Sequence, residues 1–269
     1  MLDCVFKGYP HDKYRCPHYP YFCEGDILTE VLYMKDIKGC YLREFDAMVV
    51  RSDEDNSSVE LSKTAFYPLG GGQPSDKGFI EWENERSAVR EVIKRKGILH
   101  FLDGPIPPAG KKVHCSIDWN LRYGHMKMHT AQHLLSAVIW NRYGASTVGN
   151  QIHKDRSHID FHPASFSMED LKSVEKEVND LIGEAHSVKV EEYPRELVEK
   201  KVEKGKVDLS RLPASISTLR VILIGDNGKI DICPCAGTHV ANISELGRMN
   251  IVKRKSKGSG KIRIEYELL

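Results

Sequence analysis

Short stretches of alternating apolar and polar residues, separated by glycines or polar pairs, fill the chain between residues 26 and 118. Alternation with a period of two predicts strands, because successive side chains of a strand point to opposite faces of the sheet. Many short strands joined by turns are typical of a small antiparallel barrel or sandwich. The pattern predicts strands at residues 44–51, 58–61, 78–83, 88–94, 97–102 and 112–117.

The hydrophobic period becomes helical after residue 118. One helix is expected over about 121–143 and another over about 167–185, where Ser167 and Asp170 offer a variant capping box. A short helix is expected to begin near Pro194. Further strands are predicted at residues 158–162, 187–192, 219–224, 229–233, 251–254 and 261–268.

Helices mixed with neighbouring hairpins indicate an α+β fold rather than a doubly wound sheet. The 269 residues suggest about two domains. We expect an N-terminal extension at 1–25, a small antiparallel β-barrel-like domain at 26–118 and an α+β domain at 119–269.

The composition limits the cellular locations and the kinds of binding partner that we expect. The 39 basic and 38 acidic residues leave a formal net charge of +1, so any nucleic-acid surface must be local. No apolar run approaches the roughly 18 residues of a membrane span, and no signal peptide is apparent, so we expect a cytoplasmic protein without a membrane partner. Seven cysteines form no disulfide-like framework, which favours reduced thiols available to a metal.

Two pairs of candidate metal ligands share one spacing. His129 and His133 lie four residues apart in a helical pattern, which places both rings on one face. Cys235 and His239 repeat that spacing far along the chain. Three histidines and one cysteine suit Zn²⁺, and we predict one zinc ion per chain. Cys233, two residues before Cys235, is a competing ligand that the spacing leaves open.

The zinc site is not that of a common metalloprotease. Those enzymes need a glutamate directly after the first histidine as the base, and Thr130 occupies that position. Four protein ligands favour a closed structural site, whereas catalysis needs an open or displaceable position. A second metal site is also conceivable near the N-terminus, at Cys4, His11, Cys16, His18 and Cys23, although the spacings there match no zinc knuckle or ribbon.

Two further segments are candidates for contact with a ligand. Gly70, Gly71 and Gly72, followed by Gln73, allow a backbone to approach a ligand or another domain closely, or else form a flexible turn. Residues 248–263 contain seven basic residues and no acidic one. This segment is either a strip that contacts phosphates or a solvated edge whose charge prevents aggregation. The candidate phosphate contacts are Lys253, Arg254, Lys255 and Lys257.

Together these motifs resemble the editing domain of alanyl-tRNA synthetase and its free-standing relatives, the AlaX proteins. The two metal motifs at 129–135 and 235–240, and the stretch from Thr64 through the glycines to Pro74, occur in the family's order. Shorter stretches at 122–125, 158–161 and 255–258 also fit, so the resemblance covers about residue 26 to the end. Ala236 departs from the pattern, where glycine is commoner, but leaves the ligands intact.

The resemblance implies a barrel-like domain packed on a two-layer α/β editing domain, and zinc held by His129, His133, Cys235 and His239. It implies a trans-editing hydrolase of the medium-length class that deacylates mischarged tRNA(Ala), above all seryl-tRNA(Ala), and glycyl-tRNA(Ala) in some members. We expect a monomer. Glycines 70–72 and Gln73 would then contact substrate or tRNA.

The resemblance also gives roles to two pocket residues. It places Thr64 near the substrate side chain, to distinguish serine from alanine, and suggests Gln151 as a further pocket residue. Two alternatives stay open: editing of seryl-tRNA(Thr), as in threonyl-tRNA synthetase, and a non-catalytic, zinc-stabilised RNA-binding module.

Overall fold

The structure is a computed structural model that describes residues 29–269. The five cysteines and histidines of the conceivable N-terminal metal site, between Cys4 and Cys23, lie outside the described residues. In the described part, the cysteines Cys40, Cys115, Cys233 and Cys235 are free thiols.

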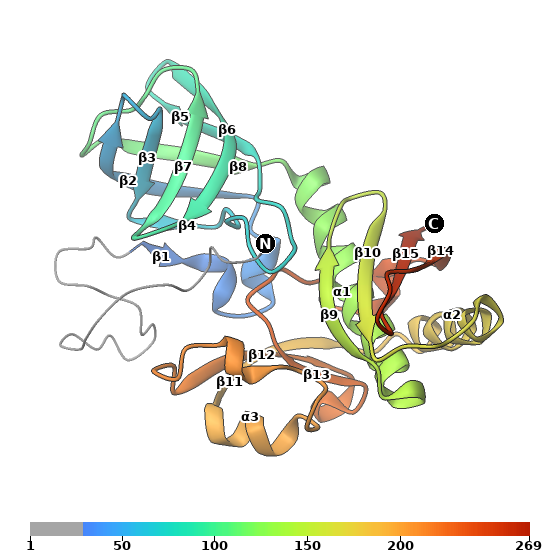
Figure 1. The fold of residues 1–269 in the computed structure, drawn as a ribbon. Helices are drawn as coiled ribbons and strands as arrows, with labels where there is room; N and C mark the ends of the chain where they lie inside the picture. The colour runs from blue at the N-terminus through green and yellow to red at the C-terminus, as the bar shows by residue number, and fades with distance from the viewer. Residues whose placement is uncertain (1–28) are drawn as a thin grey trace.

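A closed antiparallel barrel is formed by strands within residues 44–117, and the predicted α+β class is confirmed (Figure 1). All six strands predicted there are present, in the order β2-β3-β7-β6-β5-β8. Burial alternates along β2 and β8, as expected for strands with one face on a core. The strands are β2 (Glu44–Asp53), β3 (Ser58–Leu61), β5 (Gly78–Trp82), β6 (Glu85–Lys94), β7 (Ile98–Asp103) and β8 (Lys112–Ile117).

Several short elements supplement the barrel and the sheets. Strands β1 (Glu30–Val31) and β4 (Lys63–Thr64) pair in parallel as a separate two-stranded sheet. The 3-10 helices of the described chain are η1 (Leu32–Met34), η2 (Lys38–Tyr41), η3 (Leu209–Arg211), η4 (Asp226–Gly228) and η5 (Ile243–Leu246).

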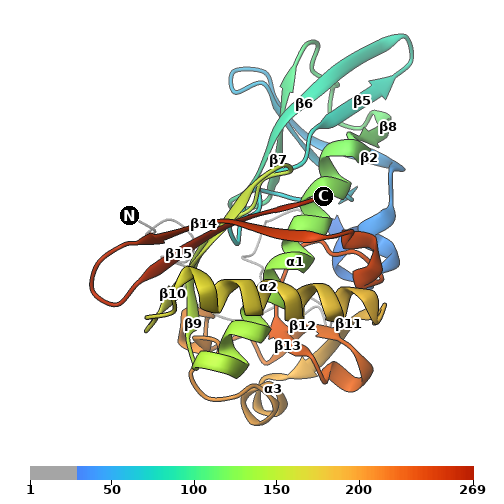
Figure 2. The ribbon, with the colours of Figure 1, turned by 90° about the vertical axis from the view of Figure 1, so that its right-hand side faces the viewer.

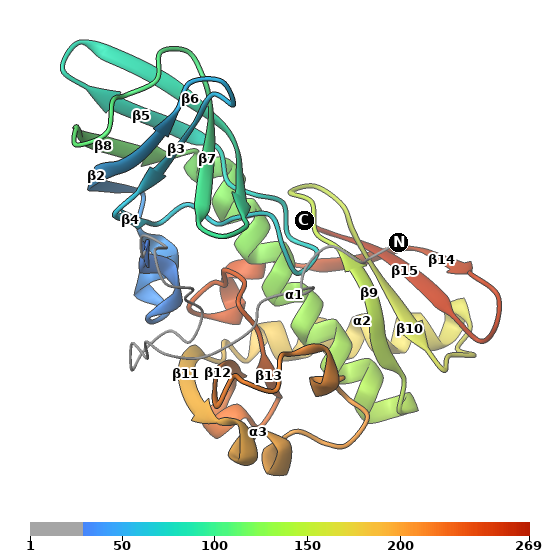
Figure 3. The same cartoon turned by 60° about the vertical axis from the view of Figure 1, so that its left-hand side comes forward.

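Helix α1 (Trp119–Tyr143) connects the barrel to the rest of the molecule, as Figure 3 shows. Asp118 caps its first turn by accepting a hydrogen bond from the Leu121 N–H, and Gly144 ends it in a left-handed conformation. Fourteen of its 25 residues are buried, so α1 is a core helix rather than a surface helix. The predicted boundary at residues 118 and 119 falls between β8 and α1, and stays a prediction.

Two sheets and two further helices surround α1 (Figure 2). The predicted capping box of α2 is confirmed at Ser167 and Asp170. One sheet has the order β14-β15-β10-β9 and the other β11-β12-β13. The strands are β9 (Ser146–Gln151), β10 (Ser157–His162), β11 (Val188–Pro194), β12 (Thr218–Ile224), β13 (Asp231–Pro234), β14 (Met249–Ser256) and β15 (Ile262–Leu268), and the helices are α2 (Met168–Gly183) and α3 (Arg195–Lys201).

The hydrophobic core is divided in the same way. The barrel has its own cluster, and a larger one joins α1 and α2 to the four-stranded sheet and the inner face of β12. A third, small cluster lies under α3. Strand β9 was not predicted, because its sequence is mostly polar and shows no alternation. In the structure, its residues are half-buried, apart from the exposed last one. Among the described helices, none combines the length and apolarity that a membrane crossing requires.

Candidate metal centre

His129 and His133 lie on the buried face of α1, as the helical spacing predicts. Their side chains are 3% and 4% exposed, and their ring centroids are 5.4 Å apart. Because the neighbouring helix residues are packed on all sides, the backbone of α1 fixes both rings relative to each other.

Cys235 and His239 have the same spacing but lie on an irregular segment. This segment follows β13 directly and has no helix or strand of its own. The Cys235 N–H donates to the Arg220 carbonyl at 3.2 Å, which extends the β12–β13 pairing to the first ligand. The Gly237 N–H donates to the Cys235 sulfur at 3.3 Å, so the segment turns around its own thiol.

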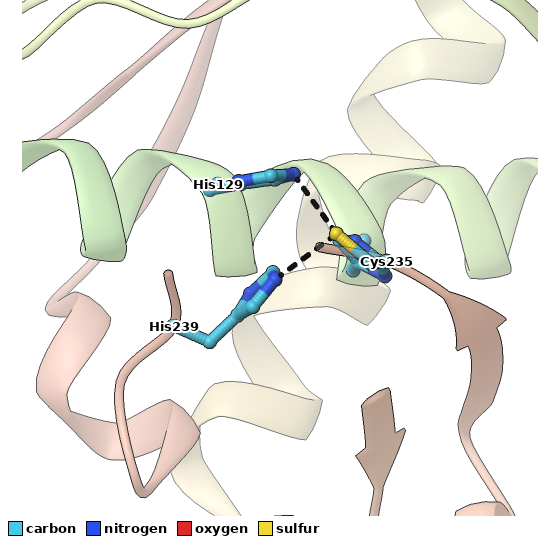
Figure 4. Close-up of side chains that lie close together, drawn as sticks. His129, Cys235 and His239 are labelled. Atoms are coloured by element: carbon cyan, nitrogen blue, oxygen red, sulfur yellow. Dashed lines mark hydrogen bonds between the residues drawn. The ribbon is translucent and has the colours of Figure 1, made fainter. Parts of the chain in front are cut away.

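The four side chains converge on one point. Their ligand atoms all lie within 4.8 Å of one another. The Cys235 Sγ is 3.6 Å from His129 Nε2 and 3.4 Å from His239 Nε2 (Figure 4). In a tetrahedral zinc site, bonds of about 2.0–2.1 Å to nitrogen and about 2.3 Å to sulfur place those atoms roughly 3.5 Å apart. The spacing and the donor set therefore fit a zinc ion.

Gln73 orients the first histidine ligand. Its Oε1 lies 2.8 Å from His129 Nδ1, and its amide nitrogen donates to Thr238 Oγ1 at 2.9 Å. Because an amide oxygen only accepts, His129 must carry its hydrogen on Nδ1, and the lone pair of Nε2 faces the cluster.

The other two histidines are oriented in the same manner. His133 Nδ1 lies 2.8 Å from Asp231 Oδ2. His239 Nδ1 lies 3.2 Å from Thr130 Oγ1, and that hydroxyl already donates to the Met126 carbonyl at 2.9 Å. The Thr130 oxygen can therefore only accept from His239, which again leaves Nε2 free for a metal.

The electrostatics favour a metal-ready thiolate. Burial raises the pKa of the Cys235 thiol, but the adjacent His129 and His239 outweigh burial and hold this pKa well below its ordinary value. Burial also holds the pKa of His239 well below its usual range, helped by the nearby His129. A thiolate and a neutral imidazole are the forms that bind zinc.

The glycine-rich loop delivers Gln73 to this centre. Gly70 and Gln73 pair with each other, while Gly71 and Gly72 adopt positive φ angles of 56° and 82°. A Cβ on Gly72 would lie 2.3 Å from the Asn150 Oδ1, and the Gly72 carbonyl accepts from the Ile152 N–H at 2.7 Å. The glycines thus serve close backbone approach to β9 and the loop that follows it.

A buried ion pair fixes the base of the same loop. Asp76 and Arg122 are both fully buried, and the Arg122 Nε lies 2.8 and 2.9 Å from the two carboxylate oxygens. The carboxylate also accepts from the Tyr67 N–H at 2.6 Å, and Arg122 Nη1 donates to the Cys40 carbonyl at 3.0 Å. Arg122 precedes His129 by two turns of α1, so the pair couples loop and ligand helix.

Thr64 and Gln151 lie apart from the ligand contacts. Thr64 is fully buried at the end of the barrel, 2.9 Å from His100 Nε2, and its Oγ1 accepts from the Phe66 N–H at 3.1 Å. Gln151 is exposed at the end of β9, while the adjacent Asn150 donates to Gly71 O and Gln132 Oε1. The suggested roles of Thr64 and Gln151 stay predictions.

The basic residues lie on edge strand β14 and the turn after it. Lys253, Lys255 and Lys257 are exposed, whereas Arg254 is half-buried and its Nε donates to the Phe166 carbonyl at 2.6 Å.

Cys233, the competing ligand, is not in the four-residue cluster and instead lies near Asp231 and His133. Cys233 lies in β13 opposite Ile222 of β12, whereas Cys235 comes after the end of that strand.

Sequence reasoning missed most of the residues that orient the ligands. Thr130 and Thr238 lie inside the two metal motifs, but the spacing gives no sign that the Thr130 hydroxyl contacts His239 or that the Thr238 hydroxyl contacts Gln73. Gly237 is needed because a Cβ there would lie 2.1 Å from the His129 Cε1. Asp231 lies two residues before Cys233, with no signal in the local pattern.

Comparison with protein families matches two segments of the chain. Residues 219–265 match the "Threonyl and Alanyl tRNA synthetase second additional domain". Residues 33–121 match "tRNA synthetases class II (A)". The first segment carries Cys235 and His239, and the second carries the barrel and the glycine-rich loop.

Similar curated proteins share most of the chain. The alanyl-tRNA editing protein AlaX-M of Methanosarcina barkeri is 35% identical over 249 residues, which cover 90% of this chain and 100% of the relative. AlaX-L of Pyrococcus horikoshii is 37% identical over 89% of this chain, but the match spans only 58% of that protein. The alanine–tRNA ligase of Thermoplasma acidophilum is 34% identical over 95% of this chain and 29% of its own length.

Proposed function

The chain belongs to the AlaX family of alanyl-tRNA editing proteins, and from that premise we propose that it is an aminoacyl-tRNA hydrolase acting in trans on mischarged tRNA(Ala). Its substrate would be seryl-tRNA(Ala) above all, with glycyl-tRNA(Ala) as a second. The observation that carries the proposal is the convergence of both metal motifs and the glycine-rich motif on one buried centre.

The chain's own residues would prepare that centre for ester hydrolysis. We propose that His129, His133, Cys235 and His239 hold one zinc ion, with Gln73, Asp231 and Thr130 fixing the three rings. A bound zinc ion supplies positive charge that either lowers the pKa of a water or holds the substrate's amino or carbonyl group. The fixed rings need little rearrangement when the substrate binds, which favours catalysis by a preorganised site.

Selection of serine is assigned to Thr64. Serine is larger than alanine by one hydroxyl, so the pocket must reward that hydroxyl with a hydrogen bond made in the transition state. Thr64→Val keeps the shape and removes the hydroxyl, at a cost of about 1–3 kcal/mol for the partner left unpaired. Hydrolysis of seryl-tRNA(Ala) should fall while that of alanyl-tRNA(Ala) stays constant or rises. If both rates drop equally, the Thr64 hydroxyl serves only the barrel, through His100.

One deacylation assay tests the proposed function. Seryl-tRNA(Ala) and seryl-tRNA(Thr) are incubated separately with the protein, and release of serine is followed. We expect release from tRNA(Ala) and little from tRNA(Thr). Release from tRNA(Thr) alone would establish the threonyl-type alternative, and tRNA binding without hydrolysis of either would establish a non-catalytic RNA-binding module.

The remaining expectations concern partners and place. We propose that Lys253, Arg254, Lys255 and Lys257 contact tRNA phosphates, and that Gly70, Gly71, Gly72 and Gln73 lie beside the acceptor end. We propose that the protein is cytoplasmic, because tRNA editing in trans needs access to free aminoacyl-tRNA, and that it is a monomer. Gel filtration with light scattering measures the oligomeric state.

A further inference from the structure

A lysine of low solvent exposure lies behind the metal centre, in a segment that contains none of the sequence motifs. The Lys206 side chain is 11% exposed, and its Nζ lies 2.8 Å from Asp231 Oδ1. The other oxygen of that carboxylate, Oδ2, is the one that accepts from His133 Nδ1 at 2.8 Å. Lys206, Asp231 and His133 thus form a continuous chain that ends at the ligand cluster.

The segment that carries Lys206 is attached to the frame of the site. The Trp140 Nε1–H of α1 donates to Glu203 Oε2 at 2.9 Å, and the Ser146 hydroxyl donates to the Gly205 carbonyl at 2.5 Å. Gly205 has a φ of +94°, and a Cβ there would lie 3.3 Å from the Trp140 ring. These contacts hold the segment against α1, so the ammonium is fixed relative to His133.

Charges carry large energies in the set of contacts formed by Lys206, Asp231 and His133, because little solvent reaches them. Asp231 is 3% exposed, and an unpaired carboxylate in such a place is strongly disfavoured. His133 contacts one of its oxygens and Lys206 the other, so the carboxylate is held in place beside the imidazole. The lysine also lies beside the second group of possible ligands, His133, Asp231 and Cys233, where its positive charge repels another cation.

We propose that Lys206 is a positioning residue of the metal centre, which acts through Asp231 to keep His133 Nε2 directed at the ion. The proposal rests on the metal centre of the proposed function but not on the tRNA substrate. Since outer partners of a metal ligand typically contribute 10- to 100-fold in metal affinity, loss of the ammonium should weaken zinc binding by about 10-fold or more.

The test is a zinc titration of the full chain against a competing chromophoric chelator. Lys206→Met is compared with Lys204→Met, a control at an exposed lysine two residues earlier. We expect a rise of about 10-fold or more in the zinc Kd for Lys206→Met, no change for Lys204→Met, and partial recovery in Lys206→Arg. An unchanged Kd in Lys206→Met would overturn the proposal, even if the metal-free protein melts at a lower temperature.

A double-mutant cycle separates positioning from general support. If Lys206 acts through Asp231, Lys206→Met should have little further effect on the zinc Kd in an Asp231→Asn background. Additive effects of the two substitutions would contradict the proposal. Should Lys206→Met fail to fold, Lys206→Gln takes its place in both experiments with the same two outcomes. Neither readout uses tRNA, so a failed deacylation assay leaves this result standing on its own.

Discussion

The two ligand pairs have the same spacing but differ in what holds them. His129 and His133 are positioned by α1 itself, whose backbone is continuous and buried. Cys235 and His239 lie on an irregular segment held by partners from elsewhere: Gln73 of the glycine-rich loop, Thr130 of α1 and the β12 carbonyl of Arg220. A helix sets the relative position of two ligands through its own backbone. An irregular segment sets it only when the distant parts of the fold that contact it are in place.

This difference predicts where substitutions are tolerated. On α1, a change beside the ligands leaves their spacing intact, because the helix hydrogen bonds set it. In the segment 235–239, the geometry depends on contacts between backbone and side chains from distant parts of the sequence. The loop pair should therefore be the more sensitive to changes outside the ligands.

The largest effect should come from removing one ligand of each kind. His133→Ala in the helix and Cys235→Ala in the loop each leave three ligands, and we expect clear loss of bound zinc in both. Metal analysis of purified protein by mass spectrometry measures this. Wild-type zinc content in both variants would show that the four residues do not form the site.

Gly237→Ala tests whether the segment 235–239 is sensitive to a change at a residue that is not itself a ligand. The added Cβ would lie 2.1 Å from the buried His129 ring, so ring or loop must shift. We expect a loss of stability of about 1–3 kcal/mol from overpacking, together with weaker zinc binding. Gly183→Ala at the end of α2 is the matched control, because its Cβ position has no atom within 4 Å apart from its chain neighbours and the backbone of its own helix. Equal denaturation midpoints and zinc affinities for the two variants would remove the steric argument.

Gln73→Leu examines the link between the two pairs. It removes the acceptor of His129 Nδ1 and the donor to Thr238 Oγ1 in one step. The zinc Kd should rise by about 10- to 100-fold, measured by chelator competition. Gln151→Leu, at an exposed glutamine, should leave the Kd unchanged. A wild-type Kd in Gln73→Leu would mean that the ligands hold their orientation without this residue.

The smallest effect on the metal should come from the basic strand, which touches neither pair. Replacing Lys253, Lys255 and Lys257 by glutamine should weaken tRNA binding and lower its salt slope by about one for each lost phosphate contact. Zinc content should not change. Lys172→Gln with Lys176→Gln on α2 is the control, since both lysines are exposed and paired with carboxylates. An unchanged salt slope would leave β14 as a solvated edge.

The sequence was informative wherever structure is local. Alternation located the six barrel strands, and helical spacing located α1 with its two histidines. Residue types and equal spacing also identified Cys235 and His239, although not the irregular backbone on which they lie. Here the donor chemistry, rather than the periodicity, carried the prediction.

What could not be predicted depends on contacts between distant segments. Nothing near Asp231 indicates that it faces His133, and nothing in the segment around Lys206 indicates that this lysine contacts Asp231. Strand β9 could not be predicted because its sequence is polar, and it forms a strand only through its pairing with β10. The sequence leaves the role of the glycines open between a flexible turn and close approach, and the structure places Asn150 directly against Gly72.

The central claim is that a helical pair and a loop pair form one metal centre with a single sulfur ligand. X-ray absorption spectroscopy at the zinc edge tests it directly in the purified, full chain. We predict one sulfur at about 2.3 Å and three nitrogens at about 2.0–2.1 Å. Two sulfurs would bring Cys233 into the site, and a shell without sulfur would remove Cys235 from it; either result would contradict the account.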